Sequence, residues 1–162
     1  MPAQITVEGL KDLQKKAEQM VRDMSGSPMV TAMREATLRV TADAKRPPAM
    51  PVDTGRLKAS ITPEVVTEGK IVRGIVGSNV TYAPYQELGT GTFVGRPRHF
   101  PPPSALETWA KRHGMGSGYV VARAIFLKGG LRPRRFLQGA IEKNAAKIHE
   151  LLSRAVDKIA GK

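Results

Sequence analysis

Cysteine is absent from the 162-residue sequence, which excludes a disulfide framework, a thiolate nucleophile and a cysteine metal site. Nowhere do about 18 apolar residues run together, so no transmembrane helix is expected. The first ten residues lack a basic region followed by an apolar run, and no signal peptide is expected either. Together these absences favour folding in the cytoplasm.

Acidic residues are also scarce, with 14 Asp and Glu against 26 Lys and Arg and a formal net charge of +12. Such an excess indicates nucleic acid, an anionic membrane or an acidic protein surface as the partner. A basic surface without a specific target would also keep a monomer soluble, and both interpretations stay open. At this length one domain with a core is the default, so a single domain is expected over residues 1–162.

Helical spacing of apolar residues is present at both ends of the chain. Steps of three and four residues predict an amphipathic helix over 6–24 and the longest helix over 136–159. Ser27 followed by Pro28 predicts the start of a second helix, which stops near Arg46 because two prolines follow. The buried stripe of this helix is expected to comprise Met29, Met33, Ala36, Thr37, Val40 and Ala44.

The period changes to two residues in the middle of the chain. Leu57, Ala59 and Ile61 alternate with polar residues and predict a strand. The turn 68–70 predicts a hairpin with a return strand through Val76, and 80–85 predicts a third strand at a sheet edge because of Pro84. The expected fold class is therefore α+β, with a small antiparallel sheet packed against N-terminal helices and a long C-terminal helix.

An insertion is expected over about 92–131. The stretch 89–103 is rich in Gly, Thr, Pro and Arg and predicts a long exposed loop. Ser104 is expected to cap a short helix that Gly114 ends, and a second short helix is predicted over 119–128. We interpret the aromatic residues of this insertion as local core or interface anchors, namely Trp109, Tyr119 and Phe126.

No pattern of catalytic, cofactor-binding or metal-binding residues emerges, so neither an enzyme nor a cofactor is predicted. His99, His113 and His149 have no second ligand at a metal-binding spacing, and no serine-nucleophile or phosphate-binding motif occurs. Asp53 and Glu87 lie beside turns and could in principle act as acid and base. The favoured interpretation makes Asp53 a turn or cap acceptor and Glu87 the ion-pair partner of an arginine.

Three motifs follow one another along the chain: Val-Asp-Thr-Gly-Arg-Leu-Lys-Ala-Ser-Ile over 52–61, Tyr-Ala-Pro-Tyr-Gln-Glu-Leu-Gly-Thr-Gly over 82–91 and Arg-Pro-Arg-Arg-Phe-Leu over 132–137. The ordered series resembles the tail-completion and neck protein family of long-tailed phages, over most of the chain from the second helix onward. The resemblance implies a small α+β structural subunit of the virion, assembled in the host cytoplasm. Copies of it would form a ring, with six-fold symmetry expected, between the filled head and the tail tube.

The resemblance also implies partners and leaves some choices open. The partners would be other copies of the chain, the head-closure or connector proteins, the tail-tube proteins and, as a further candidate, DNA passing through the lumen. No membrane and no small-molecule substrate are implied. A tail terminator, a head-side neck ring and a transient tail-completion factor need similar folds, so the motifs do not choose among them.

Physical properties of the motif residues fit ring building. Asp53 and Thr54 can bond backbone amides, Gly55 permits a chain reversal, and Tyr82 and Tyr85 offer large amphipathic surfaces. The full set of motif residues expected to support assembly is Asp53, Thr54, Gly55, Leu57, Ile61, Tyr82, Ala83, Tyr85, Glu87, Gly89, Thr90 and Gly91. The candidate interface residues are Arg96, Arg98, Trp109, Arg132, Arg134, Arg135 and Phe136.

Two other classes of function remain as alternatives. A small basic DNA-binding protein that acts without a ring would bind free DNA with strong salt dependence. A hydrolase centred on Asp53 or Glu87 would need one of these carboxylates for turnover.

Overall fold

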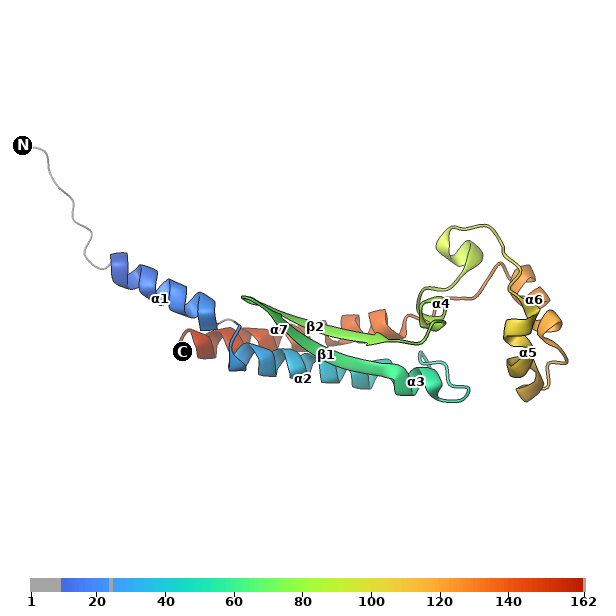
Figure 1. The fold of residues 1–162 in the computed structure, drawn as a ribbon, viewed down its shortest axis with the longest axis horizontal. Helices are drawn as coiled ribbons and strands as arrows, with labels where there is room; N and C mark the ends of the chain where they lie inside the picture. The colour runs from blue at the N-terminus through green and yellow to red at the C-terminus, as the bar shows by residue number, and fades with distance from the viewer. Residues whose placement is uncertain (1–9, 24, 162) are drawn as a thin grey trace, which may run out of the picture. The chain divides into compact units, whose positions relative to one another are not determined.

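The computed structural model describes residues 10–23 and 25–161, and its elements are α-helices, one 3-10 turn and one two-stranded sheet (Figure 1). In chain order they are α1 (Leu10–Asp23), α2 (Ser27–Ala44), α3 (Arg56–Ser60), β1 (Ile61–Glu68), β2 (Ile71–Ser78), α4 (Ala83–Leu88), η1 (Gly91–Val94), α5 (Pro103–Arg112), α6 (Gly118–Leu127) and α7 (Phe136–Ile159). The predicted α+β class, with N-terminal helices and a long C-terminal helix, is confirmed.

The chain divides into two compact units, each assembled from separate segments. The hairpin unit comprises residues 1–42, 62–77 and 140–162, and the motif unit comprises 43–61 and 78–139. All three sequence motifs fall inside the motif unit. Because both units use discontinuous segments, neither corresponds to one stretch of sequence, and the single domain over 1–162 stays a prediction.

The core of the hairpin unit lies where α2 meets α7. Ala32 and Ala36 of α2 form a buried cluster with Leu151 and Ala155 of α7. The alanines let the two helices approach closely, and Met29, Ile148 and Leu152 pack around this cluster. Strand β2 also approaches α2 closely, since a Cβ on Gly74 would lie 2.6 Å from the Thr37 methyl group.

Several predicted elements are confirmed with nearly the same bounds. The long helix begins at Phe136 and ends at Ile159, and the hairpin turns at Gly69 and Lys70. Ala36, Thr37, Val40 and Ala44 are buried on α2, as its spacing predicts, with Met29 and Met33 partly buried. The predicted first helix falls on α1, although residues 6–9 and 24 lie outside the described residues.

Two predicted strand segments are wrong. Residues 56–60 form α3, because Leu57 and Ile61 are four residues apart, a spacing that suits a helical turn as well as a strand. Ala59, which an alternating strand would bury, is exposed, and its N–H donates to the Gly55 carbonyl. The predicted third strand is instead the start of α4, where Pro84 occupies the first turn and needs no N–H donor.

The predicted insertion contains two short helices that pack against each other. Helix α5 begins at Pro103, so Ser104 lies inside the helix and the predicted serine cap is wrong. Gly118 starts α6 where a Cβ would collide with the Pro103 carbonyl oxygen, and its N–H donates to the Glu107 carboxylate at 2.7 Å. Among the residues described, no helix is long and apolar enough to cross a membrane.

Candidate functional site

The second and third motifs are held side by side by hydrogen bonds. Thr90 N–H donates to the Leu131 carbonyl at 2.9 Å, and Leu131 N–H donates to the Thr90 hydroxyl at the same distance. Further along, Arg134 N–H donates to the Gln86 carbonyl at 2.8 Å. Two segments about 45 residues apart in sequence therefore form one structure.

Gly89 and Gly91 permit this close approach. Both have positive φ angles, of 80° and 62°, and a Cβ on either would collide with the facing backbone, at Leu131 or Gly129 respectively. Only glycine satisfies both the left-handed conformation and the lack of space. The Gly89-Thr90-Gly91 tripeptide is therefore a packing site for the segment that leads into α7.

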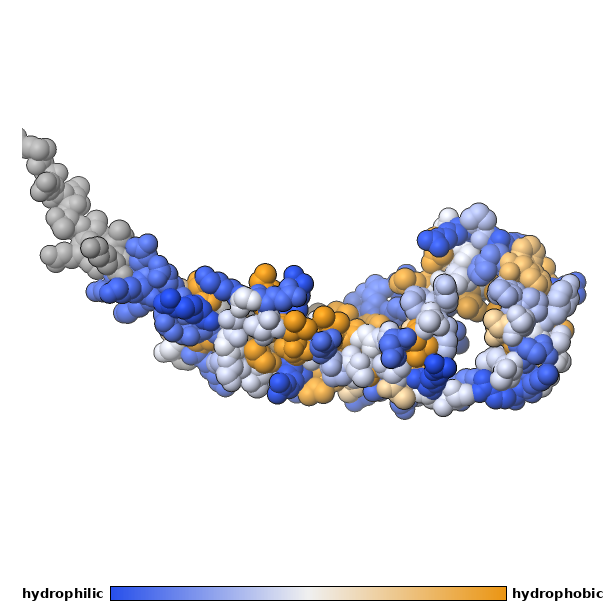
Figure 2. All heavy atoms as spheres, viewed as in Figure 1, coloured by the Kyte–Doolittle hydropathy of each residue, from blue (hydrophilic) through white to orange (hydrophobic). Residues whose placement is uncertain are grey.

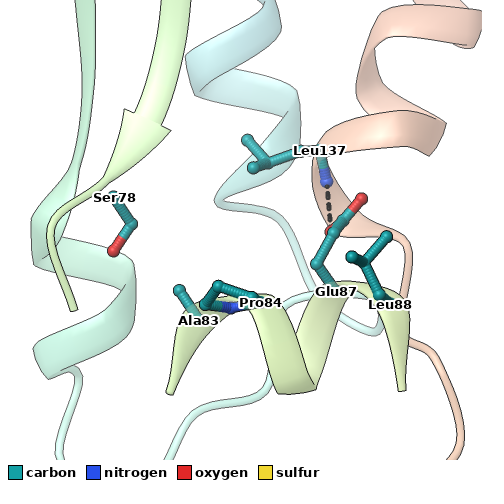
Figure 3. Close-up of a pocket in the computed structure, with 6 residues that line it drawn as sticks. All are labelled: Ser78, Ala83, Pro84, Glu87, Leu88 and Leu137. Atoms are coloured by element: carbon teal, nitrogen blue, oxygen red, sulfur yellow. Dashed lines mark hydrogen bonds between the residues drawn. The ribbon is translucent and has the colours of Figure 1, made fainter. Parts of the chain in front are cut away.

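Glu87 caps the first turn of α7. One carboxylate oxygen accepts the N–H of Leu137 at 2.9 Å, as Figure 3 shows. The other oxygen accepts the N–H of Gln138 at 2.8 Å. A carboxylate at this position satisfies two donors that have no partner within the helix and lies at the positive end of the helix dipole. The prediction that Glu87 pairs with an arginine is therefore wrong for the described residues, because its carboxylate binds backbone.

A small open pocket lies beside this cap and is drawn in Figure 3. Its volume is about 240 Å³, and its lining is mostly apolar. Glu87 is the single carboxylate in the lining, and both of its oxygens are engaged by α7.

Asp53 of the first motif binds the end of helix α5. Its Oδ2 lies 2.8 Å from the Arg112 guanidinium, and its Oδ1 lies 3.1 Å from His113 Nε2. The His113 ring also stacks on Trp109, with 4.3 Å between ring centroids. Asp53 is therefore the ion-pair partner and Glu87 the helix cap, which reverses the two roles predicted from the sequence.

The remaining residues of the first motif build α3. Gly55 adopts a left-handed conformation at the N-cap, and the Thr54 hydroxyl accepts a long 3.4 Å hydrogen bond from Arg56 N–H. Leu57 and Ile61 are buried, with 4% and 0% of their surface exposed. In the second motif Ala83 is buried, whereas Tyr82 and Tyr85 are exposed and available to a neighbour.

The candidate interface residues fall into three environments. Arg96, Arg98, Arg134 and Arg135 are exposed, and Arg132 lies over the Phe93 ring at 5.9 Å from its centroid. Trp109 is partly exposed, at 36%. Phe136 is 1% exposed, so its ring is buried within the subunit and does not fit the predicted role as an interface side chain.

Sequence reasoning missed two features of the insertion. Glu107 caps α6 from helix α5, whereas Ser117 at the N-cap position makes no side-chain cap hydrogen bond. Helix α6 is apolar around most of its circumference, yet Tyr119, Val120 and Leu127 are each at least half exposed. Tyr119 and Phe126 pack against Phe100 and still present surface to solvent, so they are both local contacts and potential anchors.

No cluster of three metal-ligating side chains occurs within 10–23 and 25–161. Over residues 3–89, which is more than half of the chain, the sequence matches the family model described as "Bacteriophage HK97-gp10, putative tail-component". The chain matches no curated protein and no solved structure. The matched region contains the first motif and residues 82–89 of the second, and it ends two residues after the Glu87 cap.

Proposed function

Because the chain belongs to the HK97-gp10-like family of bacteriophage tail components, we propose that it is a structural subunit of the virion neck. In this proposal copies of the chain form a ring, with six subunits expected, that joins the head and portal assembly to the tail tube. Its partners are further copies of itself and the connector and tail-tube proteins on either side. The role is structural and not enzymatic.

The main observation in support of ring formation is the exposed apolar surface of α6. Val120 is 50% exposed and Leu127 is 58% exposed, in a helix whose charged residues are limited to Arg123. Hydrophobic residues, in orange, lie at the surface where Figure 1 draws α6 (Figure 2). A helix that is apolar on all sides is normally buried, and a neighbouring subunit would cover this one.

A second apolar surface lies on the hairpin unit. Leu13, Met20 and Val21 of α1 are 67%, 40% and 39% exposed, although their spacing is that of an amphipathic helix. Subunits that meet head to tail in a ring each use two different patches. Two distinct apolar patches on one chain, α1 and α6, support this type of contact.

The contacts made by the two candidate carboxylates, Asp53 and Glu87, support a structural role. Asp53 binds Arg112 and His113, and both oxygens of Glu87 bind the start of α7. Both carboxylates therefore make contacts that hold the subunit together, as a structural role requires.

The proposed ring can be tested by measuring the mass of the native particle. Light scattering and negative-stain imaging of the full chain, alone and with purified tail tubes, should give a six-fold multiple of the subunit mass or rings on tube ends. Leu127→Glu should abolish rings while keeping the helical circular dichroism, because the side chain is exposed in the monomer. Arg123→Glu, a charge change on the same helix, is the control. A protein that stays monomeric and does not bind tail tubes would contradict the proposal.

A further inference from the structure

The excess positive charge is concentrated in the motif unit. Its two segments hold 13 Lys and Arg against 4 Asp and Glu, a net charge of +9. The hairpin unit holds 13 against 10, a net charge of +3, and together they give the +12 of the chain. Half of the residues therefore carry three quarters of the net charge.

All four carboxylates of the motif unit are already engaged. Asp43 pairs with Arg46, Asp53 with Arg112 and His113, and Glu107 with Lys111 and the Gly118 N–H. Glu87 caps α7. Within the described part of the chain, this leaves ten bases of the unit without a carboxylate partner, namely Lys45, Arg56, Lys58, Arg96, Arg98, Arg123, Lys128, Arg132, Arg134 and Arg135.

Most of these unpaired bases are arginines, and four of them flank prolines. Arg-Pro-Arg occurs at 96–98 and again at 132–134, where Arg135 follows. Proline fixes its own φ and restricts the preceding residue to extended conformations, so the two arginine Cα atoms are held about 6 Å apart. Arginine side chains presented in this way suit a ligand with a row of closely spaced anions.

Arg135 adds an independent observation. It has a φ of 50°, and no other non-glycine residue in the described chain has a positive φ. Ten glycines adopt such angles elsewhere, and glycine would do so here without strain. A strained backbone at a residue other than glycine suggests that its side chain has a functional role, and here that side chain is the Arg135 guanidinium.

The backbone around Arg135 is anchored. Its N–H donates to the Glu87 carbonyl at 3.1 Å, and its own carbonyl accepts the Gly139 N–H at 2.8 Å. The guanidinium is exposed, so a fixed backbone presents a free charge to solvent.

We infer that the unpaired arginines of the motif unit, centred on 132–135, bind the phosphate backbone of duplex DNA without reading its sequence. A duplex carries one phosphate about every 3.4 Å along each strand, and closely spaced arginines such as those of 132–135 suit such a row of anions. An acidic protein would need a comparable number of its own unpaired carboxylates. The inference goes beyond the proposed ring, because a ring subunit need not bind free DNA.

The test measures the salt dependence of duplex binding by the full chain. Fluorescence anisotropy with a mixed-sequence duplex of about 30 base pairs, from about 25 to about 200 mM NaCl, gives the slope of log K against log salt. The variant Arg132→Gln/Arg134→Gln/Arg135→Gly removes three charges at the site. Its matched control, Arg34→Gln/Lys70→Gln/Lys158→Gln, removes three exposed charges from the hairpin unit.

The site variant should reduce the magnitude of the slope by about 2 to 3, because each phosphate that is no longer neutralised contributes about 0.9 to the slope. The control variant should change the slope by less than about 1.

The single variant Arg135→Gly separates DNA binding from folding. It should weaken DNA binding while the unfolding temperature stays unchanged or rises. Three results would overturn the inference: equal effects of both triple variants, no salt-dependent binding by the unmodified chain, and competition by polyglutamate as effective as that by the duplex. None of these three results would contradict ring formation, which is tested separately by the mass of the native particle.

Discussion

The Glu87 carboxylate accepts the Leu137 N–H at 2.9 Å and so caps helix α7 from a segment fifty residues earlier in the chain. This hydrogen bond joins the second motif to the third. It also connects the region matched by the family model, which ends at Gly89, to the C-terminal helix beyond that region. The motifs that suggested a phage neck protein therefore build one local structure, and its stability can be tested residue by residue.

Loss of the cap should destabilise the fold. Glu87→Ala removes two charge-assisted hydrogen bonds from the first turn of α7, and we expect a loss of about 1–3 kcal/mol in the free energy of unfolding. Urea unfolding followed by circular dichroism measures it. Gln86→Ala is the matched control, since Gln86 bonds Arg134 through its backbone carbonyl alone. Equal stability of the two variants would refute the capping role.

Gly91 is required for close packing as well as for its conformation. In Gly91→Ala the new methyl group would collide with the Gly129 carbonyl oxygen, so the cost should exceed the roughly 1–2 kcal/mol of a left-handed alanine. Gly95→Ala is the control, because Gly95 has a similar φ of 68° and a Cβ added there would meet nothing within 4 Å. The difference in unfolding free energy between the two variants isolates the collision, and a difference near zero would show that the backbone relaxes freely.

The Asp53 ion pair should contribute modestly and depend on salt. Its side chain is 32% exposed, so Asp53→Asn should cost no more than about 1 kcal/mol, with the cost declining at high ionic strength. Hydrogen exchange should quicken at the end of α5, where Arg112 and His113 lose their partner. Glu64→Gln, an exposed change on β1, serves as the comparison. A salt-independent loss would argue that packing, not charge, is involved.

Glu150 on α7 should make stability depend on pH. The hydrogen bond from Lys147, at 2.8 Å, lowers the pKa of this carboxyl below its usual 4.5, with further lowering by the nearby Arg154. A carboxyl with a lowered folded-state pKa stabilises the fold above its unfolded pKa, and the effect fades as pH falls through the folded value. Glu150→Gln should thus melt at a lower temperature than the unmodified chain at pH 7, with the gap closing as pH falls below the usual pKa of 4.5 and through the lowered pKa of the folded state.

The comparison for that experiment is Asp157→Asn, which removes a charge from the same helix. A melting gap for Glu150→Gln that persists unchanged at low pH would assign its effect to helix propensity instead of the ion pair.

Local patterns were sufficient for elements whose signals are unambiguous. The three- and four-residue spacing over 136–159 predicts α7 with its observed ends, and the glycines at 69 and 129–130 mark where β1 and α6 end. Local patterns failed where one spacing suits two structures. Leu57 and Ile61 are four residues apart, which places them on one face of a helix as well as of a strand, and the burial of both does not distinguish the two.

The sequence by itself determined the fold class, most of the helices, the large positive charge and the three motifs that resemble those of phage neck proteins. Only the tertiary structure decided what the motifs do: Glu87 caps α7, Asp53 binds Arg112, and Gly91 fits against Gly129. It also located the charge excess in one unit and the apolar surface on α6. The physical reason is distance along the chain, because these interactions join residues some 40 to 60 positions apart, and no local periodicity encodes which distant groups will meet.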